Sequence, residues 1–209
     1  MTDNNLPQWL LWAREIQSIS QTGLSYCDDK FDKIRYHRLM EIAAEITHSH
    51  TNISQEILMG TFLDQSGYAT PKIGIRGAVF RERKILLVQD RDDNRWCMPG
   101  GWADVGECPS QAVAREVQEE SGFSVKPVKL IGLYDSNRVG IPLSFFHTYK
   151  IVFLCEITGG EAVTSIETSA VEFFDIDNLP PLSEERTHER HIAEAYAHVD
   201  DNIRPAAFD

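Results

Sequence analysis

Residues 6–63 carry apolar side chains at intervals of three and four, which is the spacing of one face of a helix. Asp28 or Asp29 can cap a second helix, and Ser54 precedes a third. The sequence therefore predicts three short helices. The apolar positions that define the first two are Trp9, Trp12, Ile16, Ile19, Phe31, Ile34, Leu39, Ile42 and Ile46.

After residue 68 the pattern changes to short apolar runs broken by Gly and Pro, which is typical of strands. The change predicts a small helical amino-terminal domain over 1–68 and a second domain over 69–209. Mixed strands and helices in the second domain favour a layered α/β or α+β fold. Strands are predicted at 73–80, 84–89, 95–98, 125–135, 144–156 and 171–175, and helices at 109–121 and 184–198.

Charge and composition narrow the class of protein. The 20 Lys and Arg against 32 Asp and Glu give a net charge of −12, which disfavours binding to duplex nucleic acid. A metal held by carboxylates could still attract a small anion. The apolar runs are too short to span a membrane, no signal peptide is apparent, and the four cysteines form no CxxC pair. We expect a reduced, cytoplasmic protein.

One stretch carries candidate chemistry. Gly101-Trp-Ala-Asp-Val-Gly-Glu107 is followed, after seven residues, by Arg115-Glu-Val-Gln-Glu-Glu-Ser-Gly-Phe123. Pro109 suits the first turn of a helix, and Gly122 suits the left-handed position that ends one. The helix over 109–121 is therefore expected to carry most of the charged residues of this stretch.

Three carboxylates share one side of that helix. At about 100° per residue, Glu116, Glu119 and Glu120 lie close together, beside an apolar face with Val113 and Val117. Like charges at this spacing repel, so a cation would stabilise them, and hard oxygen ligands suit Mg²⁺ or Mn²⁺. The alternative is an acidic face that simply meets solvent.

Neighbouring residues extend the predicted metal site. Glu107 enters from the preceding loop, and the turn around Gly100 lets main-chain carbonyls approach the same point. Arg115 lies four residues before Glu119, so it can pair with that carboxylate and hold its orientation.

The whole stretch resembles the Nudix box, and it matches that pattern at every specified position. The resemblance covers about residues 70–180 and implies an α/β/α sandwich with a mixed sheet. It implies Glu116 and Glu120 as the usual metal ligands, joined variably by Glu119, Glu107 and the Gly100 carbonyl, with Arg115 as the orienting arginine. The implied reaction is attack of water on a phosphorus of a diphosphate, with divalent metal as cofactor.

The general base stays open at this point. Nudix families place it either inside the box or on a later loop, so Glu119 and Glu167 are both catalytic candidates. Glu167 resembles the acidic residue that often precedes the last core strand in these proteins. Glu161 and Glu172 remain alternatives.

The arrangement of helical segment and Nudix domain resembles a bacterial subfamily of ADP-ribose or CDP-choline pyrophosphatases, in which the extra helices support a dimer. We therefore expect a homodimer, which also fits the small core available to residues 1–68. Charged residues in an aromatic setting after the catalytic helix suggest a pocket for a nucleotide substrate. The candidates are Tyr134, Asp135, Arg138, His147 and Lys150, with Phe146 as a further stacking residue.

The sequence thus predicts an enzyme that cleaves the pyrophosphate bond of a nucleoside diphosphate linked to another group, giving a nucleoside monophosphate and a phosphorylated group. Two alternatives are a Nudix fold that has lost catalysis and senses a ligand, and a hydrolase that processes RNA ends. The intact set of carboxylates disfavours the first, and the acidic charge disfavours the second.

Overall fold

The structure, a computed structural model, describes residues 6–136 and 145–208. The chain divides into two compact units. The first comprises Met1–Pro71 and Ser144–His147, and the second comprises Lys72–Leu143 and Thr148–Asp209. Within the described residues, no helix has the length and apolar character needed to cross a membrane.

Three helices form the first unit, as the apolar spacing predicts: α1 (Gln8–Tyr26), α2 (Lys30–His50) and α3 (Gln55–Leu63). Asp29 caps α2 by accepting from the Phe31 and Asp32 amides, and Ser54 caps α3. The core of the unit is built from Met40, Ala43, Ala44, Leu58 and Phe62, with Phe145 stacked against Phe62 at 4.6 Å between ring centroids.

A mixed sheet forms the second unit, which confirms the predicted fold class. Its strand order is β3-β2-β1-β5-β4-β7, with β6 paired to β2. The pair β1·β5 and the pair β4·β7 are parallel, and the other pairs are antiparallel. The strands are β1 (Lys72–Arg81), β2 (Lys84–Asp90), β3 (Trp96–Cys97), β4 (Phe123–Asp135), β5 (Thr148–Gly160), β6 (Thr168–Phe174) and β7 (Ala207–Phe208).

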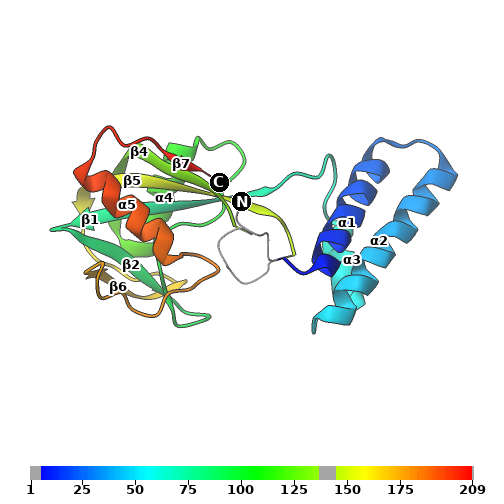
Figure 1. Ribbon diagram of the computed structural model, residues 1–209, viewed down its shortest axis with the longest axis horizontal. Coiled ribbons are helices and arrows are strands. Elements are labelled where there is room, and N and C mark those ends of the chain that lie inside the picture. The colour runs from blue at the N-terminus through cyan, green and yellow to red at the C-terminus, as the bar shows by residue number, and fades with distance from the viewer. Residues whose placement is uncertain (1–5, 137–144, 209) are drawn as a thin grey trace. The chain divides into compact units, whose positions relative to one another are not determined.

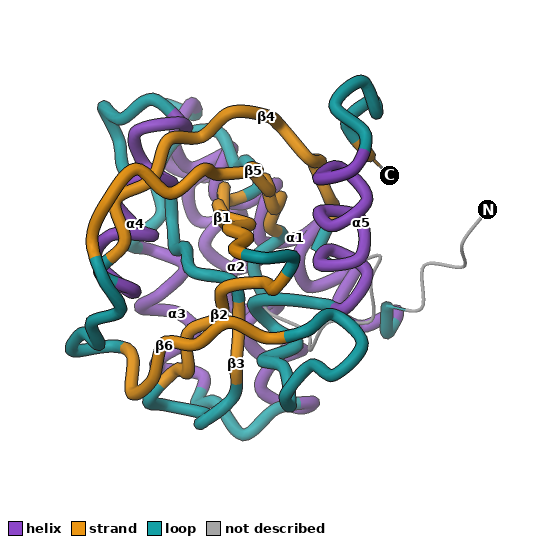
Figure 2. Tube along the Cα trace, turned by 90° about the vertical axis from the view of Figure 1, so that its left-hand side faces the viewer, coloured by secondary structure: helices purple, strands orange, loops and turns teal. Residues whose placement is uncertain are grey.

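Two helices cover opposite sides of β1 and β5 (Figures 1 and 2). Helix α4 (Pro109–Ser121) packs Val113 and Val117 against one face, where Ile75 and Val79 of β1 also lie. Helix α5 (Glu189–Asp200) packs on the other face, together with Ala78 of β1. Alternate residues of β1 therefore point to different helices.

Two elements begin later than the sequence pattern suggests. Strand β5 starts at Thr148, because residues 145–147 belong to the first unit. Helix α5 starts at Glu189, because the His188 ring accepts from the Arg190 amide and caps the helix there. The short strand β7 was not predicted, since its two residues carry no strand signal of their own.

Candidate active site

Helix α4 has the predicted bounds, and its two ends are built as expected. Pro109 occupies the first turn, and Gly122 ends the helix in the left-handed conformation at φ 79°. The buried Val113 and Val117 fix the rotation of the helix about its axis, because they must face the sheet. This rotation determines where the charged residues of α4 lie.

Arg115 holds a group of carboxylates. Its Nε and Nη2 atoms donate to the two oxygens of Glu107 at 2.9 Å, and Nη1 donates to Glu116 at 3.0 Å and to Glu119 at 2.9 Å. The guanidinium holds the pKa of Glu107 below its usual range. Arg115 therefore ties the loop residue Glu107 to the helix and fixes the orientation of these side chains.

Glu120 lies apart from Arg115 and is fixed by the glycine turn. Its Oε2 accepts from the Gly100 amide at 2.8 Å, and its main-chain oxygen accepts from the Thr168 hydroxyl at 2.8 Å. Burial raises the pKa of Glu120 to about 7, while the positive charge of Arg76 opposes that rise. The carboxylate is thus held where a cation would stabilise its charged form.

Glu116 is the second partly buried carboxylate, and burial also raises its pKa. Gly101 leaves room for it, since a Cβ at residue 101 would come within 2.8 Å of both Glu116 oxygens. In the described part of the chain, no three His, Cys, Asp or Glu side chains are grouped so as to hold a metal ion alone. Glu116 and Glu120 fit a hard divalent cation that takes its other ligands from main-chain oxygens, water and substrate phosphate, as Mg²⁺ does.

Glu167 immediately precedes β6, as the sequence suggests, and is exposed. Its neighbour Thr168 bonds the Glu120 main chain, and the Glu167 charge adds to the rise in the pKa of Glu120. Glu167 is therefore near the carboxyl-terminal end of α4. Glu172 lies within β6 between Val171 and Phe173, which pack towards α4, and Glu161 is exposed beyond the end of β5.

The candidate substrate residues do not all belong to one unit of the structure. Tyr134 and Lys150 are directly paired across β4 and β5, and both are buried. Asp135 ends β4, paired with Tyr149. His147 belongs to the first unit with Phe146, and Arg138 lies outside the described residues.

Sequence reasoning passed over Arg76, a buried arginine in the middle of β1. The available signal was a charged residue at the centre of an apolar run. His191 of α5 is also buried, and its ring lies 4.6 Å from that of Tyr134. Both residues lie near Lys150. The charge of Arg76 lowers the pKa of Lys150, and the charge of Lys150 in turn lowers the pKa of His191.

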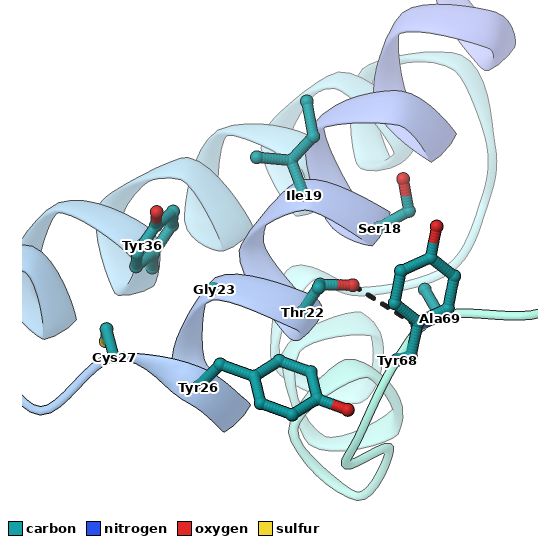
Figure 3. Close-up of a pocket in the computed structure, with 9 residues that line it drawn as sticks. All are labelled: Ser18, Ile19, Thr22, Gly23, Tyr26, Cys27, Tyr36, Tyr68 and Ala69. Carbon is teal, nitrogen blue, oxygen red and sulfur yellow. Dashed lines mark hydrogen bonds between the residues drawn. The ribbon is translucent and has the colours of Figure 1, made fainter.

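A separate hollow lies in the first unit. It has a volume of about 500 Å³ and lies over α1, α2 and the segment that follows α3 (Figure 3). Tyr26, Tyr36 and Tyr68 contribute to its lining, and the Ala69 amide donates to Thr22 at 3.2 Å. None of the described residues that line it carries a carboxylate, so this lining differs from the carboxylate cluster of α4.

Comparison with known proteins agrees with this geometry. The model of the NUDIX domain matches residues 70–196, and the model of the UDP-X-like N-terminal oligomerisation domain matches residues 7–62. The chain is 40% identical over 179 residues to YjhB of Bacillus subtilis (strain 168), provisionally named an ADP-ribose pyrophosphatase, with 86% of each chain covered.

Two solved structures are also similar. A UDP-X diphosphatase is 30% identical with a TM-score of 0.63, covering 96% of this chain and 98% of its own. An ADP-ribose pyrophosphatase from Streptococcus suis 89-1591 is 35% identical with a TM-score of 0.62, covering 67% of this chain and 100% of its own. Since the domain match includes every residue of the box, the chain belongs to the Nudix family and is a Nudix pyrophosphohydrolase.

Proposed function

We propose that the enzyme hydrolyses the pyrophosphate bond of ADP-ribose or of a closely related nucleoside diphosphate, such as CDP-choline, with Mg²⁺ or Mn²⁺ as cofactor. The observation that carries the proposal is the pair of partly buried carboxylates, Glu116 and Glu120, beside the glycine turn. The relatives named for ADP-ribose support the substrate class.

The residues of the site have different proposed roles. Glu116, Glu120 and the Gly100 carbonyl would hold the metal, with Glu119 and Glu107 as further ligands. The metal would neutralise charge on the phosphates and activate water. Arg115 keeps the carboxylates oriented through its four hydrogen bonds to Glu107, Glu116 and Glu119. The products are a nucleoside monophosphate and the phosphorylated second group.

A panel assay tests the proposal. The protein is incubated with ADP-ribose, CDP-choline, a UDP-sugar, NADH, dinucleoside polyphosphates and nucleoside triphosphates, each with Mg²⁺ or Mn²⁺, and the products are identified. Release of AMP from ADP-ribose, or of CMP from CDP-choline, at rates well above those for triphosphates is expected. Preferential turnover of nucleoside triphosphates or of dinucleoside polyphosphates would contradict the assignment.

Glu167 is our candidate for the base or for an additional metal ligand. We expect Glu167→Gln to lower kcat by about tenfold to a thousandfold with little change in KM, because proton transfer occurs after substrate binding. Glu156→Gln is the matched control, since it removes an exposed carboxylate of β5. Steady-state kinetics with ADP-ribose measures both. An unaffected Glu167→Gln, with turnover abolished in Glu119→Gln, would place the base inside the box.

Lys150 is a candidate for contact with substrate phosphate, and its burial has a separate consequence. Burial lowers its pKa to about 7 from an ordinary 10.5, and the charge of Arg76 lowers it further. The unfolded chain therefore binds this proton more tightly, so the wild-type protein loses stability as the pH falls from 10.5 towards 7. The nearby Cys97 and Glu185 oppose the shift but do not reverse it.

We therefore expect Lys150→Met to raise the KM for the substrate. We also expect the stability of the variant, compared with that of wild type, to be more favourable at pH 7 than at pH 9.5. Melting curves at pH 7 and pH 9.5 test this, since the Tm of the variant minus that of wild type should be larger at pH 7. An equal difference at the two pH values would mean that Lys150 keeps an ordinary pKa.

We propose that the first unit forms a homodimer. Along α1, Trp12, Ile19 and Tyr26 recur every seven residues and are at least half exposed, at 56%, 50% and 70%. Apolar side chains of this kind commonly mark an interface. We expect sedimentation at micromolar concentration to show a dimer, and Ile19→Glu to shift it to monomer. Ile203→Glu, at an exposed position of the second unit, should leave the dimer intact. A monomeric wild-type protein would refute this.

We also propose that the enzyme works in a reducing compartment such as the cytoplasm. All four cysteines are free thiols, and Cys97 and Cys155 are buried. Burial raises the pKa of Cys97 to about 11 and that of Cys155 to about 12. These two thiols therefore stay protonated and behave as small apolar core residues.

A further inference from the structure

Arg76 is a buried cation whose hydrogen-bonding capacity is not filled. The residue is only 9% exposed. Neither its Nε nor its Nη1 atom has a hydrogen-bond partner among the described residues. Buried donors are nearly always satisfied in folded proteins, and an unpaired buried charge is unfavourable. The carboxylates of Glu116 and Glu120 interact with its charge, but the Nε and Nη1 donors still lack an acceptor among the described residues.

The direction of Arg76 is fixed by the strand that carries it. Its neighbours Ile75 and Gly77 face the apolar layer under α4, since Ile75 lies in that core and a Cβ at Gly77 would meet Val117. By alternation, Arg76 lies on the opposite face, the one shared with Ala78 and α5. It is therefore on the side of the sheet where Lys150 and Tyr134 lie.

Lys150 places a second cation beside it. The register of β1 and β5 pairs Gly74 with Lys150, so Arg76 is two residues along the neighbouring strand and on the same face. The Lys150 ammonium donates to the Glu185 carbonyl at 3.1 Å, which is a neutral acceptor. Positive charge on both buried groups is unfavourable, since Arg76 lowers the pKa of Lys150, and an anion bound by both would remove the repulsion.

Arg76 also adjoins the catalytic carboxylates through the main chain. The amides on either side of it, those of Ile75 and Gly77, donate to Gly101 and Pro99 at 2.9 and 2.8 Å. Gly100 packs so closely on this segment that a Cβ there would lie 2.9 Å from the Arg76 Cα. The same Gly100 amide binds Glu120. The positive charge of the Arg76 side chain also acts on the pKa of both Glu116 and Glu120, so a phosphate held near these carboxylates comes within range of the guanidinium.

We infer that Arg76 is a substrate-binding residue, whose Nε and Nη1 donate to phosphate oxygens of the bound nucleoside diphosphate. Nε and Nη1 lie on different edges of the planar guanidinium, so they can donate to different oxygens of a diphosphate at the same time, which the single ammonium group of a lysine does not match. Lys150 adds positive charge to the same anion from β5. The inference rests on the proposed function, because it assigns the phosphates of that substrate to this pair of cations.

Calorimetry with AMP and with adenosine separates a phosphate contact from a structural role. The proteins are wild type, Arg76→Gln, Arg76→Lys and the control Arg83→Gln, which removes an exposed arginine paired with Asp200 at the surface. We expect wild type to bind AMP more tightly than adenosine. We expect both Arg76 variants to weaken AMP binding by about tenfold to a hundredfold while leaving adenosine binding unchanged. The control should match wild type for both ligands.

Kinetics and melting curves complete the test. Arg76→Gln should raise the KM for ADP-ribose by a similar factor and should not lower the Tm, since it removes a buried charge whose Nε and Nη1 donors are unsatisfied. Unchanged AMP binding in a folded Arg76→Gln variant would overturn the inference. Equal weakening of AMP and adenosine binding would also overturn it, by showing a structural role. Failure of wild type to hydrolyse any nucleoside diphosphate derivative would instead refute the proposed function, and the AMP and adenosine measurements would still decide the role of Arg76.

Discussion

Glu120→Gln is expected to lower turnover of ADP-ribose by at least about a hundredfold, even at saturating Mg²⁺, because the metal loses a charged ligand. The protein should remain folded. A Gln oxygen can still accept from the Gly100 amide, and the substitution removes a carboxylate whose pKa burial raises to about 7. We expect the free energy of unfolding to fall by no more than about 1 kcal/mol.

Glu116→Gln should behave in the same way, since Glu116 is the other partly buried carboxylate of the pair. Glu156→Gln is the control, because Glu156 is an exposed carboxylate of β5. Turnover is measured across a Mg²⁺ titration, with melting curves for each variant. If both box variants kept near-normal turnover at saturating Mg²⁺, the metal would have to bind elsewhere.

Gly100→Ala is expected to abolish most activity and to destabilise the second unit by a few kcal/mol. Gly100 has φ 145°, and a Cβ there would lie 2.2 Å from the Ile75 carbonyl oxygen, so the turn must move. The movement would break the hydrogen bond between the Gly100 amide and Glu120 and displace the adjoining main chain. Turnover should fall by at least about a hundredfold.

Gly67→Ala is the matched control for Gly100→Ala. Gly67 also has positive φ, at 84°, but a Cβ there meets no atom within 4 Å. It should cost about 1 kcal/mol of stability and leave turnover unchanged. Chemical unfolding and steady-state kinetics measure both effects. Equal losses of stability in the two variants would show that backbone strain, and not the clash with Ile75, limits residue 100.

The local parts of this site were predictable from the sequence, because short-range rules decide them. Pro109 and Gly122 mark the ends of α4, and the helical repeat alone places Glu116 and Glu120 near each other. The same spacing predicted that Arg115 can reach Glu119, as the structure shows. Neither helix ends nor neighbours four residues apart depend on the rest of the fold.

Long-range contacts could not be predicted in this way. Pairing of Arg115 with Glu107 requires the loop to fold back over α4, and the burial of Lys150 depends on α5 and the segment before it. His147 is three residues before Lys150 in sequence, yet it belongs to the other unit. Arg76 was missed for the same reason, since only the packed sheet shows that this charge is buried.

A short segment of the first unit lies within the sequence of the second, and this limits where the chain can be truncated. Residues 145–147 interrupt the second unit and belong to the first, where Phe145 stacks on Phe62 and its carbonyl accepts from Arg14 at 2.5 Å. Cutting the chain before Lys72 would therefore strip two phenylalanines of their partners and leave them on a loop that leads directly into β5. The helices are thus not a detachable accessory. In evolutionary terms, their gain or loss by a single terminal fusion would also have required a compensating change in this internal loop.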